Sequence, residues 1–401
     1  MSGGVENTPK LRFPEFSGEW EKSSFATNGI QIIDGDRGAN YPKSADFSSQ
    51  GECLFLSAKN VTKSGFEFDE MSFISASKDA AMNKGKLDRG DIVLTTRGSL
   101  GHIALFSDAV EHDNIRINSG MVLLRTSSKL VPSFVYQQLI SRRFQREIER
   151  ISFGSAQPQL TVQGIKKMPV SVCPLPEQQK IAAFLGAVDE KIGQLTRKKA
   201  LLEDYKKGCM GQLFTQKLRF KDDQGNDFPD WDTTKLEDIV TIKKGTQLNR
   251  DDMIQEGAFP VINGGVTASG YTNSFNAPGG SITISEGGNS CGHVAWQSRD
   301  FWLGGHCYVV SANDQKSVLT KFLFHSLRHN QAKIMRLRVG SGLPNIQKGD
   351  LLQLTLGIPH PDEQQKIADF LSAIDAKISL IADELSAAQN FKKGLLQQMF
   401  V

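Results

Sequence analysis

The side chains of this chain that could bind a ligand gather in polar loops, with one group in each half. In the first half the densest group is Thr95–His102, which places an arginine, a serine and a histidine at a predicted strand end. In the second half the matching stretch is Ser285–Ser290, with His293 close behind. Arginine pairs with guanine edges, asparagine and glutamine pair with adenine edges, and hydroxyl and amide groups hold phosphates. These loops therefore predict contacts to nucleic-acid bases and phosphates.

The candidate contact residues are loop side chains that carry hydrogen-bonding or aromatic groups. Taken singly, each is more often a solvated loop residue, and the prediction rests on two equivalent clusters in two similar domains. The candidates in the first half are Arg37, Asn40, Tyr41, Lys59, Asn60, Thr96, Arg97, Ser99, His102, Asn114, Arg116, Asn118, Ser155 and Gln157. Those in the second half are Gln247, Asn249, Arg250, Asn263, Tyr271, Asn276, Ser285, Asn289, His293, Trp296, His306, Ser341 and Asn345.

Two glycine- and serine-containing stretches, Gly154–Leu160 and Gly340–Ile346, each lie between a globular region and a predicted long helix. Backbone N–H groups exposed by such a turn can hold a phosphate. The alternative is a plain connecting turn with no ligand, and the sequence leaves both open.

Signatures of catalysis are missing from the sequence. There is no phosphate-binding G-x-x-x-x-G-K-[ST] loop, no strand-anchored G-x-G-x-x-G, and no Asn/Asp-Pro-Pro-aromatic tetrad of an amino-methyltransferase. The seven histidines are scattered, and no stretch clusters acidic residues around a lysine as a nuclease would need. We therefore predict no catalytic residue, no metal site and no cofactor bound by this chain itself.

The elements that must position the loops are revealed by a duplication. Glu177–Leu185 returns 186 residues later as Glu363–Leu371, with eight of nine positions identical. The same offset continues without a gap as far as Phe214 and Phe400. Both copies repeat apolar residues in 4-3 steps, a stripe too narrow for a globular core and suited to pairing with another helix. We predict two long helices that pair antiparallel; the alternative is two solvent-facing helices docked on separate domains.

The predicted seam is interrupted by a few lysines. In the first copy it comprises Ile181, Leu185, Val188, Ile192, Leu195, Leu202 and Cys209, with Lys199 and Lys206 among them. In the second it comprises Ile367, Leu371, Ile374, Ile378, Ile381, Leu385, Ala388, Leu395 and Met399, with Lys392 as the interruption.

The sequence predicts that the regions before the two long helices are two domains with a similar mixed α/β fold. The predicted strands of the first are Cys53–Leu56, Ile92–Thr96, Ile103–Phe106 and Met121–Leu124, and those of the second are Ser281–Ile284, His293–Trp296 and Cys307–Val310. Helices are expected over Val131–Ile151 and Val318–Arg338. Each domain is preceded by a similar Leu-Arg-Phe…Trp lead-in, within 8–20 and 217–231.

The predicted fold class is therefore α/β (α+β), with two similar globular domains, two long helices forming an antiparallel coiled coil, and an internal pseudo-two-fold repeat. The predicted boundaries are 1–174 for the first domain with its lead-in, 175–216 for the central helix, 217–360 for the second domain, and 361–401 for the C-terminal helix.

Bulk properties narrow the class further. A chain of 401 residues suits two or three domains, and 39% hydrophobic with 23% charged residues is ordinary for a globular protein. The five cysteines form no C-x-x-C and predict free buried thiols in a reducing compartment. No signal-peptide core opens residues 1–8 and no 18-residue apolar run occurs, so we expect a cytoplasmic protein.

The chain resembles the specificity subunits of type I restriction–modification systems over essentially its full length. The likeness rests on the repeated Glu-Gln-Gln-Lys-Ile-Ala-x-Phe-Leu helix starts, the Leu-Arg-Phe…Trp lead-ins, and the two divergent domains between them. This resemblance implies two target-recognition domains that each read one half of a bipartite, asymmetric DNA site, with the coiled coil as a spacer. It also implies docking of two methyltransferase subunits that carry S-adenosylmethionine, and of restriction subunits that use ATP and Mg²⁺.

The resemblance assigns the repeated helix starts to the spacer and to partner docking. The residues so assigned are Glu177, Gln178, Ile181, Phe184 and Leu185 in the first copy, and Glu363, Gln364, Ile367, Phe370 and Leu371 in the second. Two other classes of protein make different predictions. A self-sufficient DNA methyltransferase or nuclease would need the missing motifs, and an adaptor with two protein-binding heads would show no salt-dependent affinity for DNA.

Overall fold

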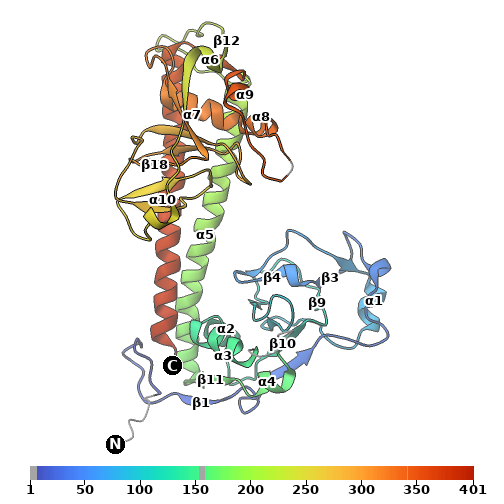
Figure 1. Cartoon of the computed structure of the whole chain (residues 1–401). Coiled ribbons are helices and arrows are strands. Elements are labelled where there is room, and N and C mark those ends of the chain that lie inside the picture. Colours follow the sequence, from blue (N-terminus) through green and yellow to red (C-terminus); the bar gives the residue numbers. More distant parts are fainter. Residues whose placement is uncertain (1–6, 153–158, 341) are drawn as a thin grey trace, which may run out of the picture. The chain divides into compact units, whose positions relative to one another are not determined.

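The computed structural model describes residues 7–152, 159–340 and 342–401, and the chain divides into two compact units (Figure 1). Unit 1 comprises Met1–Leu195 and Glu384–Val401, and unit 2 comprises Thr196–Asp383. Each unit contains one globular domain and parts of both long helices, α5 (Leu175–Phe214) and α10 (Pro361–Met399).

Unit 1 is built on a four-stranded antiparallel sheet in the order β2-β10-β7-β8. Its strands are β2 (Gln31–Asp34), β10 (Met121–Arg125), β7 (Ile92–Thr95) and β8 (Ile103–Leu105). The smaller sheets are formed by β6 (Phe73–Ile74), β3 (Cys53–Leu56) and β9 (Ile115–Ile117), by β4 (Val61–Thr62) and β5 (Gly65–Phe66), and by β1 (Glu21–Ser24) and β11 (Pro169–Val172). The helices are α1 (Ala76–Ala81), α2 (Pro132–Leu139), α3 (Arg142–Ser152) and α4 (Val162–Lys166).

Unit 2 repeats this plan with the sheet order β13-β19-β16-β17. Its strands are β13 (Val240–Lys244), β19 (Cys307–Ala312), β16 (Ser281–Ser285) and β17 (Val294–Gln297). The smaller sheets are formed by β15 (Gly270–Thr272), β14 (Phe259–Ile262) and β18 (Trp302–Leu303), and by β12 (Asp232–Lys235) and β20 (Thr355–Ile358). The helices are α6 (Leu236–Ile239), α7 (Thr320–His329), α8 (Gln331–Arg336) and α9 (Lys348–Leu352).

The predicted fold class is confirmed, and the seven predicted strands all form. The two predicted helices differ from the prediction, because each is broken into two. Val131–Ile151 divides after α2, where the Ser141 hydroxyl accepts the Phe144 N–H at 3.4 Å. Val318–Arg338 divides at Asn330, whose side chain donates to the Ser326 carbonyl at 2.9 Å. Short polar side chains that bond to nearby backbone end one helix and start the next.

The two long helices pack antiparallel. In unit 1 the beginning of α5 and the end of α10 share one core, in which Ile181, Leu185 and Leu395 are buried. In unit 2 the end of α5 and the beginning of α10 share another, which includes Leu213 and Ile367. The predicted seam is thus the packed face of both helices.

Seam lysines form ion pairs that repeat with the duplication. Lys206 of the first copy lies 2.6 Å from Asp375 of the second, and Lys392 of the second lies 2.5 Å from Asp189 of the first. The offset of 186 residues relates Lys206 to Lys392 and Asp189 to Asp375. A polar residue in a seam costs stability in the wrong alignment, so these reciprocal pairs favour the antiparallel register.

A charge reversal tests this role of the seam pairs. We predict that Asp189→Lys, which sets two lysines together, lowers the free energy of unfolding by about 1 kcal/mol, and that adding Lys392→Asp restores most of the loss. Urea unfolding of the two single variants and the double variant measures the coupling. Strictly additive losses would show that the pair has no part in setting the register.

Candidate nucleic-acid interface

Three turns of unit 1 meet at one end of its main sheet. They follow β2 at Asp34–Arg37, join β7 to β8 at Thr96–His102, and precede β10 at Asn118–Gly120. The Thr96 N–H and hydroxyl both donate to the Gly120 carbonyl, at 2.8 and 2.9 Å. A Cβ at Gly35 would lie 2.2 Å from the Asn118 carbonyl oxygen, so only glycine allows these turns to approach so closely. The sheet therefore brings together segments that the sequence predicted separately.

The predicted side chains at this end of the sheet differ in their exposure to solvent. Arg97 and Arg37 are exposed, and the Arg37 guanidinium lies 3.2 Å from Asp34. His102 is half-buried with Nδ1 2.9 Å from the Val61 carbonyl. Asn118 accepts the Gly120 N–H at 2.8 Å and so shapes its own turn. The two arginines are the exposed side chains of this cluster, and Arg37 also donates to the Ser119 carbonyl at 3.3 Å.

Several predicted residues lie away from this end or already have partners. The Asn40 amide donates to the Ala81 carbonyl at 2.8 Å, and the Asn114 amide donates to the Glu52 carbonyl at 2.8 Å. Tyr41 packs edge-on against Phe55. Exposed Lys59 pairs with Glu70, and Ser99 is half-buried.

The structure corrects the prediction for four residues whose side chains are buried: Asn60, Thr96, Arg116 and Ser285. Arg116 is 6% exposed and donates to the Asp79 carboxylate and to backbone carbonyls of α1 and the segment after it. Asn60 donates to the Glu67 and Glu70 carbonyls at 3.0 and 2.7 Å. The side chains of Asn60, Thr96 and Arg116 satisfy buried polar groups of the fold and are not presented to a ligand, whereas Ser285, although buried, lines a cavity of unit 2.

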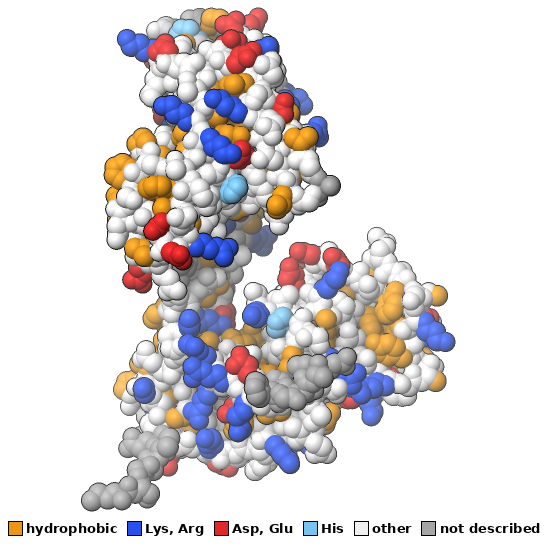
Figure 2. Space-filling model, viewed as in Figure 1, with side chains coloured by type: hydrophobic (Ala, Val, Ile, Leu, Met, Phe, Trp, Pro, Cys, Tyr) orange, Lys and Arg blue, Asp and Glu red, His pale blue; other side chains and the backbone are white. Residues whose placement is uncertain are grey.

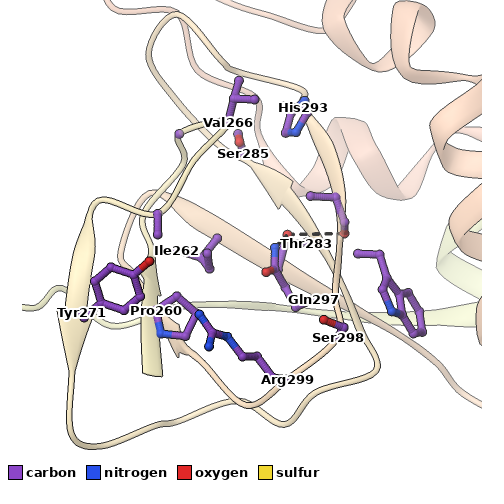
Figure 3. Close-up of a pocket in the computed structure, with 14 residues that line it drawn as sticks. Pro260, Ile262, Val266, Tyr271, Thr283, Ser285, His293, Gln297, Ser298 and Arg299 are labelled. Carbon is purple, nitrogen blue, oxygen red and sulfur yellow. Dashed lines mark hydrogen bonds between the residues drawn. The ribbon is translucent and has the colours of Figure 1, made fainter. Parts of the chain in front are cut away.

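In unit 2 the structure gathers predicted residues around a cavity of about 280 Å³ (Figure 3). Tyr271, Ser285, His293 and Trp296, all predicted from the sequence, line it. In the figure the Tyr271 ring and the Arg299 guanidinium lie toward one end, and Ser285 and His293 lie at the other. The cavity is lined by residues of β14, β15, β16 and β17, the last of which is an outer strand of the main sheet.

Sequence reasoning missed several residues of this cavity. Gln297 donates to the Thr283 hydroxyl at 2.9 Å, and exposed Arg299 lies just beyond β17. Both residues could have been predicted from the sequence, because they are polar and lie within three residues of the end of the predicted strand at Trp296.

Burial sets the chemistry of His293. Its pKa is lowered, first by burial and second by the positive charge of Arg328. The imidazole is therefore neutral at neutral pH and offers one donor and one acceptor, as reading of a base edge requires.

The other predicted residues of unit 2 have diverse surroundings. The Asn276 amide bonds twice to the Leu303 backbone, at 2.6 and 3.1 Å, and the Asn263 amide accepts the His306 N–H at 3.1 Å, so both hold loops in place. Asn345 pairs with the Val339 backbone. The exposed residues are Gln247, Asn249, Arg250, Asn276, Asn289 and His306. Ser155, Gln157 and Ser341 lie outside the described residues.

The repeated helix start is a buried joint. Glu177 is fully buried, accepts two hydrogen bonds from the Arg12 guanidinium at 2.8 Å, and accepts the Trp20 indole N–H at 3.3 Å. Glu363 repeats these contacts with Arg219, at 3.1 and 2.7 Å, and Trp231, at 3.1 Å. Each carboxylate ties a lead-in segment to the first turn of a long helix.

The adjacent glutamines tie the helices to the globular domains. Gln178 accepts a hydrogen bond at 2.9 Å from the N–H of Val131, the N-cap residue of α2. It also donates to the Cys173 carbonyl at 2.8 Å. Gln364 accepts a hydrogen bond at 2.9 Å from the N–H of Leu319, the N-cap residue of α7. It also donates to the Pro359 carbonyl at 2.9 Å. Each amide satisfies backbone groups of a helix start and of the segment before its own helix.

The sequence predicted that ten residues of the helix starts form the spacer and dock a partner. The structure corrects the docking prediction for the eight of them that are buried. Glu177, Gln178, Ile181, Leu185, Glu363, Gln364, Ile367 and Leu371 are buried inside their units. Phe184, 36% exposed, and Phe370 lie at the surface, where they meet Phe13 and Phe220 edge-on. Only these two have surface left to offer a partner.

Among the described residues, no three His, Cys, Asp or Glu side chains come together as a metal site would require. His325 and His329 have the i, i+4 spacing of many metal ligands, but His325 Nε2 lies 3.3 Å from the Ser372 hydroxyl and the His329 ring stacks on Phe214. The five cysteines are free, and burial raises the pKa of the Cys53 thiol to about 12. No helix of the described chain is both long and apolar enough to cross a bilayer.

The duplicated architecture defines a class of protein with two loop-bearing domains on paired helices, and comparison with known proteins agrees. A family model described as the type I restriction modification DNA specificity domain matches residues 27–204 and 229–389. The chain belongs to this family.

The relatives bear specificity-subunit names. A putative type I specificity subunit of Mycoplasma pneumoniae is 28% identical over 171 residues, which cover 42% of this chain and 45% of the relative. The chain thus spans about half the length of that relative. A putative type I restriction enzyme specificity subunit of Methanocaldococcus jannaschii is 24% identical over 371 residues, 84% of each chain.

Solved structures share the fold. The crystal structure of a type I restriction-modification system S subunit from M. genitalium matches with a TM-score of 0.71 at 18% identity, covering 98% of this chain and 99% of the other. A second match, described as "Structural basis underlying complex assembly and conformational transition of the type I R-M system", has a TM-score of 0.52 at 16% identity and covers 96% and 98%.

The joint at Glu177 leads to a stability prediction. Glu177→Gln leaves the Arg12 guanidinium without its countercharge, so we predict a loss of about 3–5 kcal/mol in the free energy of unfolding, and a similar loss for Glu363→Gln. The control is Lys180→Gln, which removes a half-exposed pair with Glu15 on the same helix turn. Solvent screens that pair, so the control loses far less. Equal thermal stability of Glu177→Gln and the control would contradict the joint.

The Asp79 cluster leads to a pH prediction. Burial alone raises the pKa of Asp79, but hydrogen bonds from Lys86 and Arg116 outweigh it and lower the pKa to about 2 from 3.8. A depressed folded pKa stabilises the protein above about pH 4, and this contribution is lost as pH falls toward about 2. We predict that Asp79→Asn costs about 3 kcal/mol at neutral pH and removes this part of the acid sensitivity.

Urea unfolding at neutral and acid pH measures both effects of Asp79→Asn. The matched control is Asp108→Asn, which removes an exposed carboxylate of the same unit. If both variants followed the same pH profile, the Asp79 cluster would not be the acid-sensitive element.

Proposed function

We propose that this chain is the DNA-reading subunit of a type I restriction–modification complex and that each of its two domains reads one half of a bipartite, asymmetric site. The observation that carries the proposal is the repetition of one scaffold with different loop side chains. The turns between β7 and β8 and between β16 and β17 are equivalent, yet one presents Arg97 and the other adjoins a cavity with Tyr271 and Arg299. Equivalent positions with different chemistry suit two different half-sites.

The charge of the surface is compatible with this role. Figure 2 shows lysine and arginine side chains spread over both units with acidic ones among them, and the chain carries a formal net charge of +3. Such a surface favours DNA contact through particular basic loops rather than through one uniformly basic face. The long helices would serve as the spacer between the two readers.

The proposal extends to partners and cofactors. Two methyltransferase subunits carrying S-adenosylmethionine would dock on the two halves, because pseudo-equivalent halves offer equivalent surfaces to two copies of one partner. Restriction subunits using ATP and Mg²⁺ would complete the complex. The chain itself would contribute no catalytic group and no cofactor, and the neighbour described in terms of complex assembly supports such a partnership.

Co-expression with a methyltransferase subunit of this family tests the proposal, with modified adenines mapped across the host genome by single-molecule sequencing. We expect one bipartite motif with an unread gap, and no modification when either chain is expressed alone. Methylation by this chain alone would reveal an active site of its own. A stable complex that methylates nothing would favour an adaptor without a DNA role.

A further inference from the structure

Unit 2 has a second hollow, a groove of about 580 Å³ bounded by β17, α7, α5 and α10. Its lining includes three cationic side chains, Lys206, Lys321 and Arg328, and one carboxylate, Asp375. The groove is therefore positively charged.

The single carboxylate of the groove, Asp375, already forms an ion pair. Both oxygens of Asp375 lie 2.6 Å from the Lys206 ammonium. The Lys321 ammonium lies 3.4 Å from the centre of the Trp296 ring, and the Arg328 guanidinium donates to the Val294 carbonyl at 2.9 Å. The Arg328 guanidinium also donates to the Gln331 amide oxygen at 2.5 Å. The salt bridges found among the described residues include neither of these two cations, so no paired carboxylate offsets their charge.

Holding these cations close together in a groove costs free energy unless an anion accompanies them. Burial lowers the pKa of Lys321 and of Arg328, although Asp375 opposes that shift in both. His325 beneath them has a pKa lowered to about 3 and is neutral, so it does not add to the charge. An anion in the groove would offset the desolvation of both cations.

The fold does not require these cations. Gln178 and Gln364 make the same bond to the N-caps of α2 and α7, so the two helices can be aligned residue by residue. At the places of Lys321 and Arg328, unit 1 has Ser133 and Ile140. The seam ion pair, in contrast, is present in both units. Two of the groove's three cations thus have no counterpart at the aligned positions of unit 1, so the shared scaffold does not need them.

We propose that this groove holds phosphates of the DNA backbone next to the sequence that unit 2 reads, with Lys321 as the principal contact. The inference rests on the proposed function and deepens it. The groove shares His293 and Trp296 with the cavity of Figure 3, so the two hollows adjoin at β17, and in this proposal one duplex contacts both. Phosphate contacts of this kind fix position and carry no sequence information.

The test is the salt dependence of binding between the full chain and a random-sequence DNA duplex. Each phosphate contact adds about 0.9 to the slope of log affinity against log salt concentration. We expect Lys321→Gln to reduce this slope by about 1 and to weaken binding at low salt by up to about tenfold, equally for all sequences. Lys321→Arg keeps the charge and should bind as the unchanged chain does.

The matched control is Lys243→Gln, an exposed lysine on β13 at the opposite edge of the same sheet, which should leave the slope unchanged. If the unchanged chain shows no salt-dependent DNA binding, the proposed function itself fails. If it binds but Lys321→Gln keeps the full slope, only the groove assignment is overturned. Weaker assembly of Lys321→Gln with the methyltransferase subunit, at an unchanged slope, would likewise overturn it and assign the groove to an acidic protein segment.

Discussion

The burial of one carboxylate at the start of each long helix is the constraint on which each unit depends. Taking a carboxylate out of water costs several kcal/mol unless a countercharge and hydrogen bonds replace the solvent. Glu177 and Glu363 are 0% exposed, and each obtains both from an arginine and a tryptophan of its lead-in segment. The helix N-terminus adds a favourable field. The neighbouring glutamine then fixes the first helix of the globular domain, so two adjacent side chains join three parts of each unit.

The duplication also explains how each unit is closed. In unit 2 the lead-in follows directly from α5, and the Leu218 N–H donates to the Gln212 carbonyl at 3.2 Å. In unit 1 the lead-in begins near the chain's start, yet the Leu11 N–H donates to the equivalent carbonyl of Gln398 at 2.9 Å. An aromatic cluster completes each joint, made of Trp20, Phe134 and Phe400 in one unit and Trp231, Phe322 and Phe214 in the other. Each unit therefore includes the C-terminal part of the long helix from the other copy of the repeat.

The repeated helices, their seam and the main strands could be predicted from the sequence, because periodicity and duplication are local signals. The contact residues were harder to predict, because exposure depends on tertiary structure. Arg116 and Asn60 have the same chemistry as Arg97 and Asn289, yet the first two are buried among backbone carbonyls and the last two face solvent. The role of Glu177 was equally hidden, since its arginine partner is 165 residues away in sequence.

The most direct test of the two-reader account is a domain exchange. Residues 232–340 are replaced by the corresponding domain of a relative with a different target, and the methylated motif is mapped in the presence of the methyltransferase subunit. The account predicts that one half-site changes while the other half-site and the gap stay the same. A change in both half-sites, or in neither, would contradict the assignment of one half-site to each unit.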